Sequence, residues 1–146
     1  MRVAGKVALI SGGARGIGAA CARLLAREGA AVVLGDLLEE EGRQTEAEII
    51  EAGGQALFVP LDVTCEEDWL RVVQATVASY GKLDVLVNNA GISNRRGLEE
   101  ISIEVWDRVM GVNAKGVFLG TKAAIPEMRK ADGGSIINIS SIYGLV

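Results

Sequence analysis

The amino-acid sequence predicts an α/β protein with a doubly wound parallel sheet of five strands. Short apolar runs of strand length alternate along the chain with longer segments in which apolar residues recur at helical spacing. One of these runs, residues 30–35, has no polar alternation, as expected for a parallel strand that is covered on both faces. Right-handed crossovers would then place helices on both faces of the sheet.

The first predicted elements are an apolar strand over residues 7–10, a glycine-rich loop and a helix that reaches residue 26. The loop has the spacing Gly12-x-x-x-Gly16-x-Gly18 rather than the more common G-x-G-x-x-G. Such a turn directs backbone N–H groups and the positive end of a helix dipole to one place, which suits a phosphate or pyrophosphate. A turn without a ligand is the alternative. The helix is predicted from its apolar residues at helical spacing: Ile17, Cys21, Leu24 and Leu25.

The remaining elements follow in order along the chain. Strands are predicted at residues 30–35, 56–61, 82–87 and 135–139. A polar helix is predicted over 39–52, and a long helix over about 113–129. Between them, Thr64 with Glu67 predicts a capping box for a helix that ends at Gly81, and Ser102 is expected to cap a short helix.

Polar side chains stand where the predicted strands end: Ser11, Asp36, Asp62, Asn88, Asn89, Ser140 and Ser141. Ligands of open parallel sheets bind at this edge. Asp36 can accept hydrogen bonds from both ribose hydroxyls of an adenosine and would repel a 2′-phosphate, which favours NAD over NADP. An aspartate that only caps the next helix is the alternative. Arg15 could pair with a phosphate, but Leu37 adds no second cation.

Composition limits the classes of function. The 146 residues, of which 49% are hydrophobic, suffice for one domain over 1–146, and the net charge of -4 argues against a nucleic-acid-binding surface. Cys21 and Cys65 are interpreted as reduced thiols, no metal site is predicted, and the absence of histidine leaves acid–base chemistry to other side chains. Because charges interrupt every apolar run, neither a signal sequence nor a membrane span is predicted, and we expect a cytoplasmic protein.

From about residue 5 onward, the chain resembles the short-chain dehydrogenase/reductase family, whose fold is Rossmann-like. Six motifs carry the resemblance, in the order and at the spacing of the family: the glycine loop from Gly12 to Gly18, Asp36, Asp62-Val63, Asn88-Asn89-Ala90-Gly91, Asn113 and Ile139-Ser140-Ser141. Ser11 stands where the family more often has threonine. The resemblance implies hydride transfer between NAD and a secondary alcohol or ketone, and a homo-oligomer, either dimer or tetramer.

The resemblance also assigns roles to single residues. It implies that Asp62, with Val63 beside it, holds the adenine amino group, and that Asn113 bends the long helix and holds a water in a proton relay. Ser141 would hydrogen-bond the substrate oxygen. The cofactor-binding residues implied in the glycine loop and after the fourth strand are Gly12, Arg15, Gly16, Ile17, Gly18, Asn89, Ala90 and Gly91.

One part of the family pattern is missing from these 146 residues. The acid–base tyrosine of the family, with a lysine four residues later, lies roughly a dozen residues beyond the serine. Here Tyr143 follows Ser141 too closely, and Tyr80 is followed by Asp84 at the lysine position. We therefore expect the N-terminal part of a longer single domain, truncated after the fifth strand. A non-catalytic NAD-binding or scaffold protein and an NADPH-linked ketoreductase are the alternatives, the latter opposed by Asp36.

Overall fold

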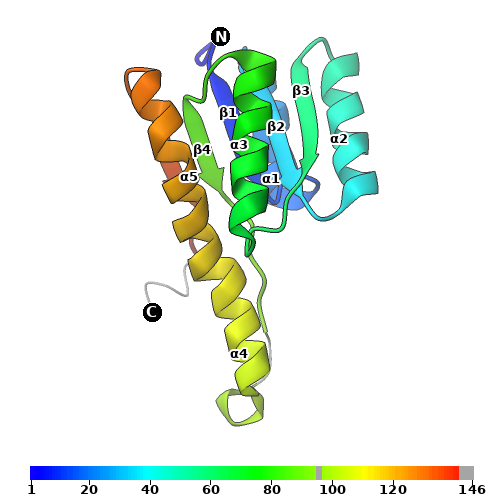
Figure 1. Ribbon diagram of the computed structural model, residues 1–146. Helices are drawn as coiled ribbons and strands as arrows, with labels where there is room; N and C mark the ends of the chain where they lie inside the picture. The colour runs from blue at the N-terminus through cyan, green and yellow to red at the C-terminus, as the bar shows by residue number, and fades with distance from the viewer. Residues whose placement is uncertain (95–96, 142–146) are drawn as a thin grey trace.

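The computed structural model describes residues 1–94 and 97–141 (Figure 1), so Tyr143 lies outside the described residues. All five strands are parallel, and their order across the sheet is β3-β2-β1-β4-β5. The strands are β1 (Val7–Ser11), β2 (Ala31–Asp36), β3 (Gln55–Pro60), β4 (Val85–Asn88) and β5 (Ser135–Asn138). The helices are α1 (Gly16–Arg27), α2 (Glu39–Glu51), α3 (Glu66–Tyr80), α4 (Ile103–Met110) and α5 (Gly116–Lys130), with a 3-10 turn at Leu98–Glu100.

Helices cover both faces of the sheet, which confirms the predicted doubly wound architecture. On one face α1 and α2 pack over Ile10, Val32 and Phe58, and on the other α3 and α5 pack over Leu9 and Val33. The two faces alternate along each strand, as the two-residue period of a strand requires. Every residue of β1 is buried, so the strand that leads into the glycine loop lies in the middle of the core.

Helix α1 is present as predicted, and it turns small residues toward the sheet. It buries Gly18, Ala19, Ala22 and Ala26, while Ile17 is 64% exposed, Leu24 is 50% exposed and Leu25 is partly buried. Small side chains let the helix axis come close to β1 and β2, so the alanine stripe, not the larger apolar residues, faces the sheet.

The capping box predicted at Thr64 is wrong. Helix α3 begins at Glu66 after Cys65, and no side chain caps it by a hydrogen bond. Thr64 instead donates its backbone N–H and its hydroxyl to Asp62 Oδ1, at 2.8 and 2.7 Å. The local turn of Asp62 thus takes the hydroxyl that the helix was expected to use.

Helices α4 and α5 are joined without a break by a π-helical turn, Gly111–Lys115, so the long helical segment begins ten residues before the predicted start. The α4 end of this segment extends away from the sheet (Figure 1). In α5, Leu119 and Ala124 are buried among the core residues shared with α3. The homo-oligomer stays a prediction from the resemblance.

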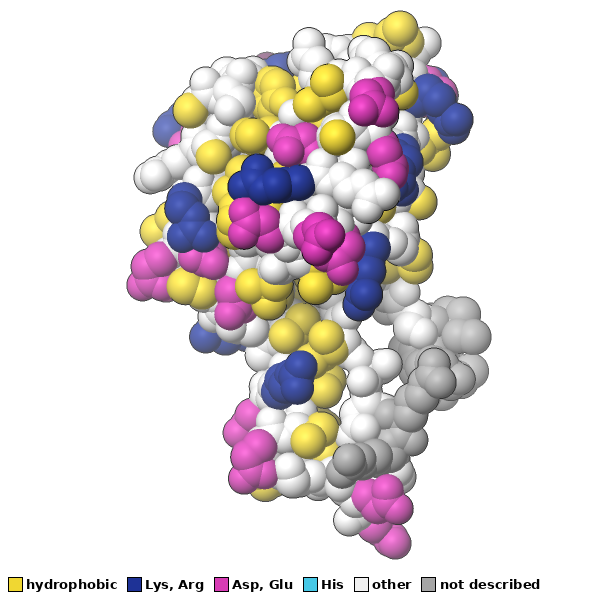
Figure 2. Space-filling view, turned by 90° about the vertical axis from the view of Figure 1, so that its right-hand side faces the viewer, with side chains coloured by type: hydrophobic (Ala, Val, Ile, Leu, Met, Phe, Trp, Pro, Cys, Tyr) yellow, Lys and Arg dark blue, Asp and Glu magenta, His cyan; other side chains and the backbone are white. Residues whose placement is uncertain are grey.

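The edge strand β3 is covered by side chains of α2 and α3. The Phe58 N–H donates to Glu46 Oε1 at 2.8 Å, and the Arg71 guanidinium donates to the carbonyl of Pro60 at 3.0 Å. On the face of the molecule seen in Figure 2, basic and acidic side chains are interspersed. No helix among the described residues has the length and apolar character needed to cross a membrane.

Candidate functional site

The backbone conformation of the glycine loop is one that suits its glycine residues. Gly12 and Gly16 have φ of +67° and +58°, a region that glycine occupies without strain. A Cβ on Gly18 would overlap the Gly12 carbonyl oxygen and would lie 2.6 Å from Asn89 Nδ2. Glycine at position 18 is therefore required for α1 to start this close to the end of β1.

The first turn of α1 is open. Its N-cap residue, Arg15, has extended backbone and makes no side-chain capping bond, and the first turn contains no acidic residue. Arg15, Gly16 and Ile17 are exposed. The first N–H groups of a helix have no intrahelical partner and carry the positive end of its dipole, so this turn can accept an anion such as a phosphate.

Asp36 ends β2 beside this loop and is partly exposed. Its Oδ2 accepts from the Ala14 N–H at 3.0 Å, and its Oδ1 accepts from the Leu38 N–H at 3.1 Å. A carboxylate has about four acceptor positions, so two further hydrogen bonds, such as those from ribose hydroxyls, can still be accepted. The sequence did not indicate that Asp36 also binds the backbone of the glycine loop.

Ser11 and Asn89 fasten the loop to the end of β4. The Ser11 hydroxyl oxygen accepts from the N–H groups of Asn89 and Ala90, both at 3.1 Å. The Asn89 side-chain amide donates to the carbonyls of Ser11 and Gly12, both at 3.0 Å. Asn89 therefore orients the glycine loop, while Gly91 beyond it is exposed.

Asp62 and Val63 follow β3 at the same edge. The backbone N–H of Asp62 donates to Asp68 Oδ2 at 2.9 Å, and the Val63 carbonyl accepts from the buried Trp69 indole at 3.0 Å. The Arg71 hydrogen bond, followed by that of Asp62, lowers the pKa of Asp68 against the effect of burial. These contacts fix the Asp62 backbone next to the start of α3.

Asn113 lies in the π-helical turn and binds the loop that follows β4. Its Oδ1 accepts from the Ile92 N–H at 2.9 Å, and its Nδ2 donates to the Ile92 carbonyl at 2.8 Å. π-helical turns of this kind occur often at functional sites. Ser141 follows β5 and, like Asn113, is exposed.

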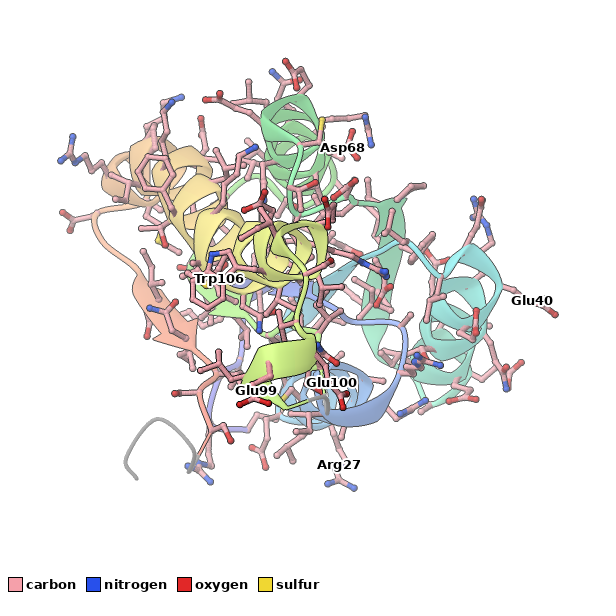
Figure 3. The ribbon with its side chains drawn as sticks, turned by 90° about the horizontal axis from the view of Figure 1, so that it is seen from below. Arg27, Glu40, Asp68, Glu99, Glu100 and Trp106 are labelled. Carbon is pink, nitrogen blue, oxygen red and sulfur yellow. The ribbon has the colours of Figure 1, made fainter. Side chains whose placement is uncertain are left out.

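The glycine loop, Asp36, Asp62 and Asn89 follow four neighbouring strands at the same edge of the sheet. The glycine loop, Asp36 and Asn89 form one hydrogen-bonded group, and Asp62 belongs to a separate network with Asp68. Figure 3 shows this end of the molecule, with the α4 end of the long helical segment toward the viewer and Trp106 beside it. A site at the carboxyl edge of the sheet is the usual place for a ligand in this architecture.

Comparison with known proteins identifies the class to which this fold and site belong. Residues 6–146 match the family described as short chain dehydrogenase. The chain belongs to the short-chain dehydrogenase/reductase family, as the motifs predicted.

Individual relatives agree with this assignment. The chain is 54% identical over 144 residues to 2,5-dichloro-2,5-cyclohexadiene-1,4-diol dehydrogenase of Sphingobium indicum, and 52% identical over 145 residues to cyclopentanol dehydrogenase of Comamonas testosteroni. Both alignments cover 99% of this chain and 58% of the relative. The solved structure of a short-chain dehydrogenase/reductase mutant from Serratia marcescens superposes with a TM-score of 0.90 at 37% identity, covering 97% of this chain and 57% of that one. The chain thus spans somewhat more than half the length of these relatives.

Proposed function

We propose that this chain is part of an oxidoreductase that transfers hydride between NAD and a secondary alcohol or ketone carried on a ring. The observation that carries the proposal is the open first turn of α1 with Asp36 beside it. A pyrophosphate suits that turn, and a ribose suits the carboxylate. The relatives named above act on a cyclohexadiene diol and on cyclopentanol, which supports a cyclic alcohol as substrate.

The proposed NAD-binding residues lie along the edge in the order of the dinucleotide. Asp62 and Val63 would hold the adenine and Asp36 its ribose. The N–H groups at the start of α1, from Arg15 to Gly18, would hold the pyrophosphate, which Gly12 lets approach the backbone. Arg15 and Ile17, both exposed on this turn, would contact the cofactor from outside, and Asn89, Ala90 and Gly91 would border the ribose. When bound, NAD supplies the hydride chemistry.

Ser141 and Asn113 are the proposed catalytic residues of this chain. The Ser141 hydroxyl would donate a hydrogen bond to the substrate oxygen and so stabilise the negative charge that develops there. Asn113 would hold a water for proton transfer, with its side chain oriented by the two bonds to Ile92.

The cofactor proposal is tested by titrating the chain with NAD and NADP in a calorimeter. We expect NAD to bind at least about tenfold more tightly, since the Asp36 carboxylate repels a 2′-phosphate. Asp36→Asn should reduce this ratio toward one. The ratio is the informative quantity, because losing the Ala14 contact would weaken both cofactors alike.

Three other outcomes are distinct. Equal or tighter binding of NADP by the unaltered chain would exclude the NAD preference, and failure to bind either would exclude a dinucleotide site. NAD binding without oxidation of cyclopentanol, measured in a protein that continues to the length of the relatives, would favour a non-catalytic binding protein.

A further inference from the structure

Side chains bind both backbone polar groups of Ala14, its N–H and its carbonyl. Ala14 lies in the middle of the glycine loop and is 1% exposed. Its N–H donates to Asp36, as described above, and its carbonyl accepts from the hydroxyl of Thr45 at 2.8 Å. Thr45 belongs to α2, so an element outside the loop and outside the sheet also fixes the loop.

The Thr45 hydroxyl takes part in a second hydrogen bond. Its side chain is buried, and its hydroxyl oxygen accepts from Arg23 Nη2 of α1 at 3.3 Å. Arg23 is held in turn by Glu48 Oε2, which accepts from Nε at 3.0 Å and from Nη2 at 2.7 Å. A continuous set of hydrogen bonds therefore joins α1, α2 and the glycine loop.

A second buried threonine shows that this arrangement is not the ordinary one for a helix. Thr76 of α3 donates its hydroxyl to the Val72 carbonyl of the same helix, four residues earlier, at 2.7 Å. Thr45 donates instead to the glycine loop, 31 residues earlier in the chain. The hydroxyl of Thr45 thus orients another segment rather than its own helix.

We propose that Thr45 is a positioning residue for the phosphate-binding loop, an inference that rests on the proposed function. In a trans peptide the carbonyl and the following N–H point in opposite directions. By holding the Ala14 carbonyl toward α2, Thr45 directs the Arg15 N–H away from α2. Thr45 and Asp36 together fix the two peptide planes on either side of Ala14 before a cofactor arrives.

The test replaces the hydroxyl of Thr45 by a methyl group of similar size. Thr45→Val should raise the Kd of NAD and of ADP-ribose roughly three- to tenfold, the usual effect of one buried hydrogen bond. Adenosine has no pyrophosphate, so its Kd should change by less than about twofold. Thr45→Ser keeps the hydroxyl and should restore binding. Thr76→Val is the matched control, because it makes the same substitution at a buried threonine that does not contact the loop.

Hydrogen exchange of the cofactor-free chain gives a second measurement. Thr45→Val should speed exchange of the amides from Gly13 to Gly18, whereas Thr76→Val should not. Unchanged exchange and unchanged NAD affinity in Thr45→Val would overturn the inference, and so would equal losses of affinity for adenosine and ADP-ribose. If the unaltered chain binds neither NAD nor ADP-ribose, the proposed function fails, and the exchange measurement alone decides whether Thr45 orders the loop.

Discussion

Helices α1 and α3 both begin at the carboxyl edge of the sheet, yet their first turns are built in opposite ways. The first turn of α3 carries Glu66, Glu67 and Asp68. Glu66 pairs with Lys122 and Asp68 with Arg71, and Glu67 accepts from the Cys65 thiol. Neither helix has a side-chain cap, but the first turn of α1 contains no acidic residue.

At one helix start the protein itself supplies negative charge to the helix dipole, and at the other a ligand could supply it. The acids of α3 meet the positive end of its helix dipole with protein charges. At α1 no acidic side chain of the first turn meets the dipole, and positions 16 and 18 of that turn are glycines. Both starts follow parallel strands of one sheet, so the contrast comes from side chains and not from topology.

The largest effect is expected from Gly18→Ala, which adds a methyl group to the open first turn of α1. The added Cβ would overlap the Gly12 carbonyl, so either the helix or the loop must shift. Overpacking of this kind costs about 1–3 kcal/mol of stability, and NAD affinity should fall with it. Gly111→Ala is the control, because its Cβ would lie 3.7 Å from the Thr64 methyl, an ordinary contact. Thermal unfolding and NAD titration of both variants check this expectation, and equal behaviour would contradict it.

A smaller effect is expected from Ile17→Glu, which gives α1 an acid like those of α3. Beside a bound pyrophosphate, the carboxylate should raise the Kd of NAD about five- to tenfold relative to Ile17→Gln. In the absence of NAD it should stabilise the helix by about 0.3–1 kcal/mol through the dipole. Weaker NAD binding together with higher stability of the cofactor-free chain is the result that indicates a phosphate at this turn. Equal NAD affinity in the two variants would mean that no phosphate lies at this turn.

The smallest effect is expected from replacing Asp68, one of the acids in the first turn of α3. Its pKa lies below the ordinary value of 3.8, so the folded state favours the ionised form. The resulting stability is present above pH 3.8 and is lost as the pH falls through the lower pKa of the folded state. Asp68→Asn should lower stability at neutral pH by about 1 kcal/mol.

Urea unfolding over a series of pH values measures this contribution. Below the ordinary pKa of an aspartate, the Asp68→Asn variant should lose less stability than the unaltered chain. Asp107→Asn, at an exposed position of α4, provides the control. Parallel stability curves for the unaltered chain and Asp68→Asn would contradict the assignment.

Sequence patterning predicted the fold class and the five strands, because buried parallel strands and glycine-terminated helices leave strong local signals. It failed where the deciding contact was not local. The spacing of Ile17 and Leu24 predicted helix α1, but it did not indicate that the residues buried against the sheet would be glycine and alanine. The cap predicted at Thr64 failed for a local reason instead, because the competing acceptor, Asp62, is only two residues away.

The candidate site could likewise be predicted only in the parts that leave a local signal in the sequence. The glycine loop and Asp36 were predicted from spacing, since few other structures need glycine at these positions. Thr45 was missed because a threonine inside a polar helix gives no signal of its contact 31 residues away. Asn113 was indicated by resemblance, but its bonds to Ile92 depend on how the segment after β4 meets the helix.

The coverage of β3 has a consequence for aggregation. Because the Leu61 N–H bonds to the Asp36 carbonyl, the outward positions of this edge strand are Ala56, Phe58 and Pro60. Glu46 occupies the Phe58 N–H, and proline has no N–H to offer. A foreign strand approaching this edge would find a backbone donor only at Ala56. The sheet is thereby protected on its β3 side against edge-to-edge polymerisation, without a further strand or helix to cover it.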